Sequence, residues 1–111
     1  MACVDPGHLT CTANDYGFEQ VFSRWVEALG KPGDCLVVLS TSGNSENIRK
    51  AIASAKSRQM TTVALLGKGG GSLRGVCDHQ LIVPGETSDR IQELHMLVLH
   101  VLVESLEALM A

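Results

Sequence analysis

The sequence has 111 residues, which is enough for one domain, and 45% of them are hydrophobic, as expected of a globular chain. The formal net charge is −3, which argues against a nonspecific nucleic-acid binder, because such a protein needs a basic face to neutralise phosphates. Residues 91–110 form the longest apolar-rich stretch, but polar and charged residues interrupt it, so no membrane span is predicted. The first residues lack a basic segment followed by an apolar one; we expect no signal peptide and a cytoplasmic location.

Four cysteines are present, and in the cytoplasm they are expected to be reduced: Cys3, Cys11, Cys35 and Cys77. Cys3, His8 and Cys11 are spaced like half of a zinc site. Since no second half follows, we expect partly buried free thiols instead of a structural zinc ion.

The first half of the sequence predicts an irregular start and then a helix. Residues 1–14 are expected to be irregular. Apolar residues at spacings of three and four then predict a helix over residues 17–29. Asn14 or Asp15 is a candidate cap at its start, and Gly30 a candidate end.

Two apolar runs, residues 35–40 and 61–66, predict strands that are covered on both faces, as in a parallel sheet. Polar residues 41–45 form a loop between the first run and a predicted helix over residues 45–58. The glycine-rich residues 67–72 are expected to form a flexible connector.

A third strand at residues 80–83 and a long helix at residues 87–110 complete the pattern. The alternation of helices and strands predicts an α/β fold, a doubly wound parallel sheet between two helical layers. Three strands make a thin sheet. We therefore expect residues 1–111 to be a partial domain that lacks an N-terminal part or borrows one from a partner.

The segment Ser40–Ser45 places hydroxyl groups and a glycine between a strand and the start of a helix. Such hydroxyls, together with the free N–H groups of a first helical turn, are typical of a phosphate cradle. An ordinary helix cap with solvated hydroxyls explains the same residues, and the segment alone does not decide between the two. No lysine follows Gly43, which excludes a P-loop.

Four segments resemble, in the same order, the phosphoheptose isomerase family of the sugar isomerase (SIS) domain superfamily: residues 14–18, 22–30, 40–45 and 89–95. The hydroxyl-rich loop alone marks only the superfamily. Its combination with Asp89-Arg-Ile-Gln and with His100, eight residues after Gln92, is more specific. Family members have in addition an N-terminal helical region, a first strand with a Gly-rich loop, and a helix with a His and a Glu, and none of these is found in this sequence.

The resemblance implies the conversion of sedoheptulose 7-phosphate to D-glycero-D-manno-heptose 7-phosphate, the first step toward the heptose of lipopolysaccharide. It implies His100 as the acid/base residue. The implied substrate-binding residues are, at the phosphate, Ser40, Thr41, Ser42 and Ser45, and, at the sugar, Asp15, Asp89 and Gln92.

The resemblance also implies one zinc ion per subunit, with Gln92 and His100 as two of its ligands. On one helix these residues are about 12 Å apart along the axis and roughly 80° around it, so their side chains reach a shared ion only when stretched. A site completed by another element or subunit places less strain on the two side chains. Without the resemblance, His100 is a core or interface histidine. His95 is expected to have a supporting or structural role, and His8 and His79 to lie in surface loops.

The apolar residues of the last helix lie around much of its circumference, which predicts self-association, and the resemblance implies a homotetramer. A noncatalytic SIS module is the alternative function, either one that binds a protein, like the relative that associates with the bacterial replication initiator, or one that senses a sugar phosphate. Ser42, Asp89 and His100 favour the enzyme. An arabinose phosphate isomerase fits the loop but not the last helix. By itself, the 111-residue chain is expected to be nearly inactive.

Overall fold

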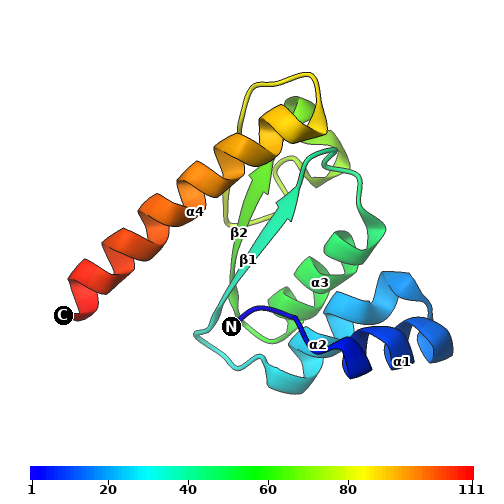
Figure 1. Cartoon of the computed structure of the whole chain (residues 1–111). Helices are drawn as coiled ribbons and strands as arrows, with labels where there is room; N and C mark the ends of the chain where they lie inside the picture. The colour runs from blue at the N-terminus through cyan, green and yellow to red at the C-terminus, as the bar shows by residue number, and fades with distance from the viewer.

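Three parallel strands form the centre of the structure, a computed structural model that describes all 111 residues (Figure 1). They are β1 (Cys35–Ser40), β2 (Thr61–Leu66) and β3 (His79–Ile82), and they lie side by side in chain order. Cys35 pairs with Thr61 and Ser40 with Leu66, so β1 and β2 end at the same edge of the sheet. The predicted α/β fold with a parallel sheet is therefore confirmed.

Helices α2 (Val21–Leu29) and α3 (Glu46–Ser57) lie on one side of this sheet (Figure 1). Because side chains alternate along a strand, Leu36, Val38 and Ser40 of β1 share one face. The main core cluster joins this face to α3 and to the segment after β2, and its buried members are Val38, Ile52, Ala64, Leu66 and Leu73. The core is thus aliphatic.

The opposite face of β1 is more open than expected. Helix α4 (Ser88–Met110) buries only Ile91 and His95, and its C-terminal half extends away from the other elements (Figure 1). Val37 and Leu39 remain 39% and 40% exposed. The prediction that residues 35–40 are covered on both faces is wrong in this structure, because α4 is buried only through its first two turns.

The prediction that residues 1–14 are irregular is wrong, because most of them belong to helix α1 (Pro6–Tyr16). The Asp5 carboxylate accepts a hydrogen bond of 2.9 Å from the backbone N–H of His8, and proline occupies the first helical position. Asn14 and Asp15 belong to α1 and cap no later helix. The sequence pattern does not predict α1, because the polar and apolar residues of this helix show little periodicity.

The remaining element boundaries agree closely with those predicted from the sequence. The helix predicted over residues 17–29 is divided into a short 3-10 turn, η1 (Phe18–Gln20), and α2, and Gly30 follows the end of α2 as expected. The predicted strands and later helices differ from β1, α3, β2, β3 and α4 by about one residue at each end. No helix, α4 included, is long and apolar enough to cross a membrane.

Asp78 ties the start of β2 to the segment before β3. Its carboxylate accepts hydrogen bonds from the backbone N–H of Thr62, at 2.8 Å, and from the Thr62 hydroxyl, at 3.2 Å. These two bonds hold the pKa of Asp78 below its usual value. We predict that Asp78→Asn lowers the melting temperature at pH 7. Because the pKa is lowered on folding, the stabilisation is present above the unfolded-state pKa and is lost as pH falls through the folded-state pKa.

The measurement is the melting temperature of both proteins between neutral and acidic pH. The difference between the two proteins should shrink in acid. Glu86→Gln is the matched control, because Glu86 is exposed and has no hydrogen-bond partner in the chain, and it should show little change. Parallel curves for wild type and Asp78→Asn over the whole range would contradict the assignment.

Candidate functional site

The hydroxyl-rich loop, residues 40–45, leads from the end of β1 into α3, as the sequence predicts (Figure 1). The Ser40 hydroxyl accepts a hydrogen bond from the backbone N–H of Gly43, at 3.1 Å, and lies 2.9 Å from the Ser45 hydroxyl. The Ser42 hydroxyl accepts from the N–H of Asn44, at 3.1 Å. The N-cap residue Ser45 makes no side-chain hydrogen bond to the start of α3, and Asn47 Oδ1 accepts from the N–H of Ile48 at 2.8 Å, so the N–H groups of Glu46 and Asn47 stay available as donors.

The glycine-rich segment after β2 supports this loop and is not a flexible connector, so that prediction is wrong. It forms 3-10 turns, η2 (Lys68–Leu73). The N–H of Leu73 donates to the Gly43 carbonyl at 2.9 Å, and the N–H of Ser72 donates to Asn44 Oδ1 at 2.9 Å. Three consecutive glycines with positive φ allow the chain to fold back onto the loop.

A cavity of about 430 Å³ opens beside the loop, at the end of β1. It is lined by residues of β1, the loop and α4: Leu39, Ser40, Thr41, Ser45, Gln92, His95 and Met96. The hydroxyls of Thr41 and Ser88 lie 3.3 Å apart and connect the loop to the start of α4. The cavity therefore lies at the carboxyl edge of a parallel sheet, where open α/β folds bind their ligands.

A family model described as "SIS domain" matches residues 2–67, which is more than half of the chain. The chain belongs to the SIS domain family. The matched residues include the hydroxyl-rich loop that follows β1.

The chain is also similar to phosphoheptose isomerases. The relative from Fusobacterium nucleatum is 56% identical over 106 residues, covering 96% of this chain and 55% of that protein. The relative from Vibrio cholerae is 50% identical over 112 residues, covering all of this chain and 59% of that protein. The chain thus spans little more than half the length of these curated relatives, and the resemblance found in the sequence is confirmed.

Solved structures agree with the fold. A phosphoheptose isomerase from Neisseria gonorrhoeae superposes with a TM-score of 0.88 at 44% identity, covering 92% of this chain and 58% of that one. A phosphoheptose isomerase from Francisella tularensis gives a TM-score of 0.86 at 41% identity, covering 90% of this chain and 54% of that one.

Four of the predicted site residues of this SIS domain line the cavity together: Ser40, Thr41, Ser45 and Gln92. Ser42 lies in the same loop, but its hydroxyl is bonded to Asn44. His100 lies on the exposed part of α4, two turns beyond Gln92. It is not among the residues that line the cavity.

The two predicted carboxylates are outside the cavity as well. Asp15 lies on α1, where it accepts hydrogen bonds from the Cys11 thiol, at 3.5 Å, and from Asn14 Nδ2, at 2.9 Å. Asp89 lies exposed in the first turn of α4, and a hydrogen bond from the Thr87 side chain is the main cause of its lowered pKa. Neither carboxylate is among the residues that line the cavity, although Asp89 directly follows Ser88, whose hydroxyl lies 3.3 Å from that of Thr41.

The side chains of this chain do not form a zinc site by themselves. No group of three or more His, Cys, Asp or Glu residues is placed to hold a metal ion. Gln92 lines the cavity and His100 does not, and two separated donors are too few for the tetrahedral coordination that zinc prefers. Zinc binding at these residues would require ligands from outside the 111 residues.

The structure adds residues that the sequence did not assign to the site. His95 is only 2% exposed and borders the cavity, and its spacing of three from Gln92 was the signal that both share one helix face. Ser88 contacts Thr41, a pairing with no signal in the sequence. His8, expected in a surface loop, instead lies on α1 with Nε2 2.7 Å from the Val21 carbonyl and its ring 5.1 Å from Trp25.

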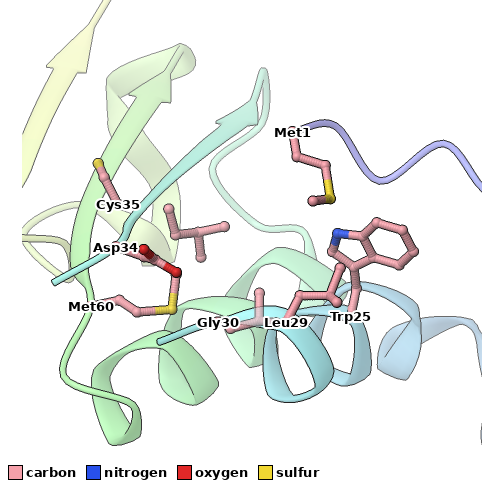
Figure 2. Close-up of a pocket in the computed structure, with 9 residues that line it drawn as sticks. Met1, Trp25, Leu29, Gly30, Asp34, Cys35 and Met60 are labelled. Atoms are coloured by element: carbon pink, nitrogen blue, oxygen red, sulfur yellow. The ribbon is translucent and has the colours of Figure 1, made fainter. Parts of the chain in front are cut away.

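A second cavity, of about 340 Å³, lies at the opposite end of β1 (Figure 2). It is lined mainly by apolar residues, with Trp25 on one side and Met60 on the other. The Asp34 carboxylate there accepts a hydrogen bond from the Lys31 N–H. The sulfur atoms of Met1, Cys35 and Met60 do not converge (Figure 2). This hollow offers no cluster of donors for a phosphate.

The contact between Gly43 and the glycine-rich segment leads to a prediction for stability. Gly43 has φ +68°, and a Cβ there would collide with the carbonyl oxygen of Gly70. Gly69 has φ +74°, but a Cβ there would meet nothing within 4 Å. Both alanine variants bear the cost of a positive φ, and only Gly43→Ala adds a backbone collision. We expect Gly43→Ala to lose roughly 1–3 kcal/mol more stability than Gly69→Ala in urea unfolding. Equal losses would show that the contact is not tight.

Proposed function

We propose that this chain forms the phosphate-binding part of an isomerase that converts sedoheptulose 7-phosphate to D-glycero-D-manno-heptose 7-phosphate. The observation that carries the proposal is the convergence of Ser40, Thr41, Ser45 and Gln92 on one cavity at the carboxyl edge of the sheet. The similarity to phosphoheptose isomerases supports the same substrate class. We place the reaction in the cytoplasm, on the route to the heptose of lipopolysaccharide.

The cavity suits a phosphate because its wall offers neutral donors next to a helix start. The hydroxyls of Ser40, Thr41, Ser42 and Ser45 lie in the loop, and the free N–H groups of residues 46 and 47, in the first turn of α3, follow it. Such N–H groups and the helix dipole favour an anion. No lysine or arginine lines the cavity, so the loop and the helix supply the binding energy.

Isomerisation of an aldose and a ketose moves a proton between two neighbouring carbons and therefore needs a positioned base and acid. In our proposal His100 serves the proton transfer, while Gln92, Asp15 and Asp89 contact the sugar. His100 and the two carboxylates lie outside the cavity, so further protein segments or subunits would have to complete the site. A zinc ion in the complete site would take Gln92 and His100 as two of its ligands.

We predict that the 111-residue chain alone turns over sedoheptulose 7-phosphate at least about 10²–10⁴-fold more slowly than the same chain joined to the N-terminal half of the Fusobacterium relative. The chain alone contains the phosphate loop but no complete set of proton-transfer and zinc groups. The measurement is a coupled isomerase assay of both proteins with added zinc.

Full zinc-dependent turnover by the chain alone would show that the base lies within it. No turnover by the joined protein, with sugar phosphate still bound, would instead favour a noncatalytic SIS module. Ser45→Ala in the joined protein should weaken substrate binding, because Ser45 is one of the residues that line the cavity.

We also propose that α4 mediates assembly, as a homotetramer in the complete protein. The exposed apolar side chains of this helix lie on several of its sides: Met96, Leu97, Val101, Leu102, Val103, Leu106, Leu109 and Met110. A patch of this kind on a soluble chain marks an interaction surface. Another copy of the same helix offers matching apolar residues.

Val101→Glu should therefore lower the average molar mass measured by light scattering, because it places a charge in the apolar contact. Ala28→Glu is the control, since Ala28 is exposed on α2, away from α4. It should leave the molar mass unchanged. A monomeric wild-type chain, or an unchanged mass for Val101→Glu, would contradict assembly through α4.

A further inference from the structure

His95 is the only ionisable residue among the buried residues of the chain, and neither the phosphate loop nor the proposed proton transfer uses it. It is 2% exposed, lies two turns into α4 and borders the cavity beside Ser40, Thr41 and Ser45. Each ring nitrogen of a buried imidazole at the edge of a cavity acts either as a hydrogen-bond donor or as an acceptor.

One ring nitrogen is fixed by the sheet. His95 Nε2 lies 2.9 Å from the carbonyl oxygen of Leu66, the last residue of β2. A carbonyl oxygen can only accept hydrogen bonds, so Nε2 must hold a proton and donate it. The same oxygen accepts the backbone N–H of Val83 at 3.0 Å. This carbonyl therefore holds the ring in one orientation.

The other nitrogen is left for a ligand. With the proton on Nε2, the uncharged ring has a lone pair on Nδ1, which is an acceptor. Nδ1 has no hydrogen-bond partner in the chain, and no buried side-chain nitrogen or oxygen atom lacks a partner. Nδ1 is therefore accessible, and because His95 borders the cavity and is otherwise enclosed, the accessible edge of the ring faces that cavity.

The position of this acceptor complements the phosphate loop. Leu66, which anchors His95, is the register partner of Ser40, so the imidazole ring is held at the strand position next to the one that leads into the loop. Ser40, Thr41 and Ser45 are hydroxyls that can donate to an anion. A ligand that places an anionic group on the loop and a hydroxyl hydrogen a short distance away would satisfy both.

We infer that His95 determines specificity by accepting, at Nδ1, a hydrogen bond from a hydroxyl of the bound sugar phosphate. This role rests on the proposed function, because it needs a phosphate ester with hydroxyl groups as ligand. The hydrogen bond at Nδ1 discriminates between sugar phosphates and simple phosphate esters, because the latter carry no hydroxyl that could donate to this nitrogen. His95 acts in recognition and takes no part in moving a proton.

The first test compares two ligands on two proteins by calorimetry at pH 8. His95→Gln keeps an N–H near the position of Nε2, for the Leu66 carbonyl, and removes the acceptor at Nδ1. We expect it to bind sedoheptulose 7-phosphate roughly tenfold more weakly than wild type, the usual effect of one lost hydrogen bond. Methyl phosphate, which has no hydroxyl at this pH, should bind both proteins within twofold. Unchanged affinity for sedoheptulose 7-phosphate would overturn the role of His95.

The second test uses the unaltered chain, in case the variant does not fold. Nitrogen-15 NMR of the histidine ring should show Nε2 protonated and Nδ1 unprotonated. The Nδ1 resonance should move upfield with sedoheptulose 7-phosphate and stay in place with methyl phosphate. A proton on Nδ1, or no movement with the bound sugar, would overturn the inference alone. If sedoheptulose 7-phosphate binds no better than methyl phosphate, the inference and the proposed substrate class both fail.

Discussion

The contact between the hydroxyl-rich loop and the glycine-rich segment after β2 is the constraint on which the candidate site depends. The Gly43 carbonyl accepts the N–H of Leu73, and the backbone around Gly43 lies so close to Gly70 that no side chain fits between them. Leu73 is itself fully buried in the core. The shape of the loop is therefore tied to the packing of the sheet, and its hydroxyls are ordered before any ligand arrives.

The parallel register extends this order to α4. Because Ser40 and Leu66 are partners, the hydroxyl-rich loop and the carbonyl that holds His95 lie at the same edge of the sheet. The hydrogen bond between His95 and Leu66 fixes the first two turns of α4 over that edge, and Gln92 is brought into the cavity as a result. One edge of a three-stranded sheet thus collects residues from three distant segments of the chain.

The same architecture leaves much apolar surface exposed. One face of β1 and the C-terminal half of α4 have few contacts, and the residues predicted for proton transfer and zinc binding lie outside the cavity. Both features support the proposals that α4 mediates assembly and that further segments or subunits complete the site. The donors proposed for the phosphate come from neighbouring residues of the loop and the start of α3, whereas the residues proposed for proton transfer come from distant parts of the chain.

Local patterns in the sequence were enough to predict the parallel α/β fold, the loop at Ser40–Ser45 and the boundaries of most elements, because apolar periodicity and turn residues act locally. It missed α1, whose helix rests on the Asp5 cap and proline more than on periodicity, and it took the glycine-rich segment for a flexible connector. Three contacts became visible only in the folded chain: this segment packs against Gly43, the Ser88 hydroxyl contacts that of Thr41, and His95 is held by Leu66 at the border of the cavity. These contacts join residues far apart in the chain, and strand register and helix placement, which no local pattern encodes, bring them together.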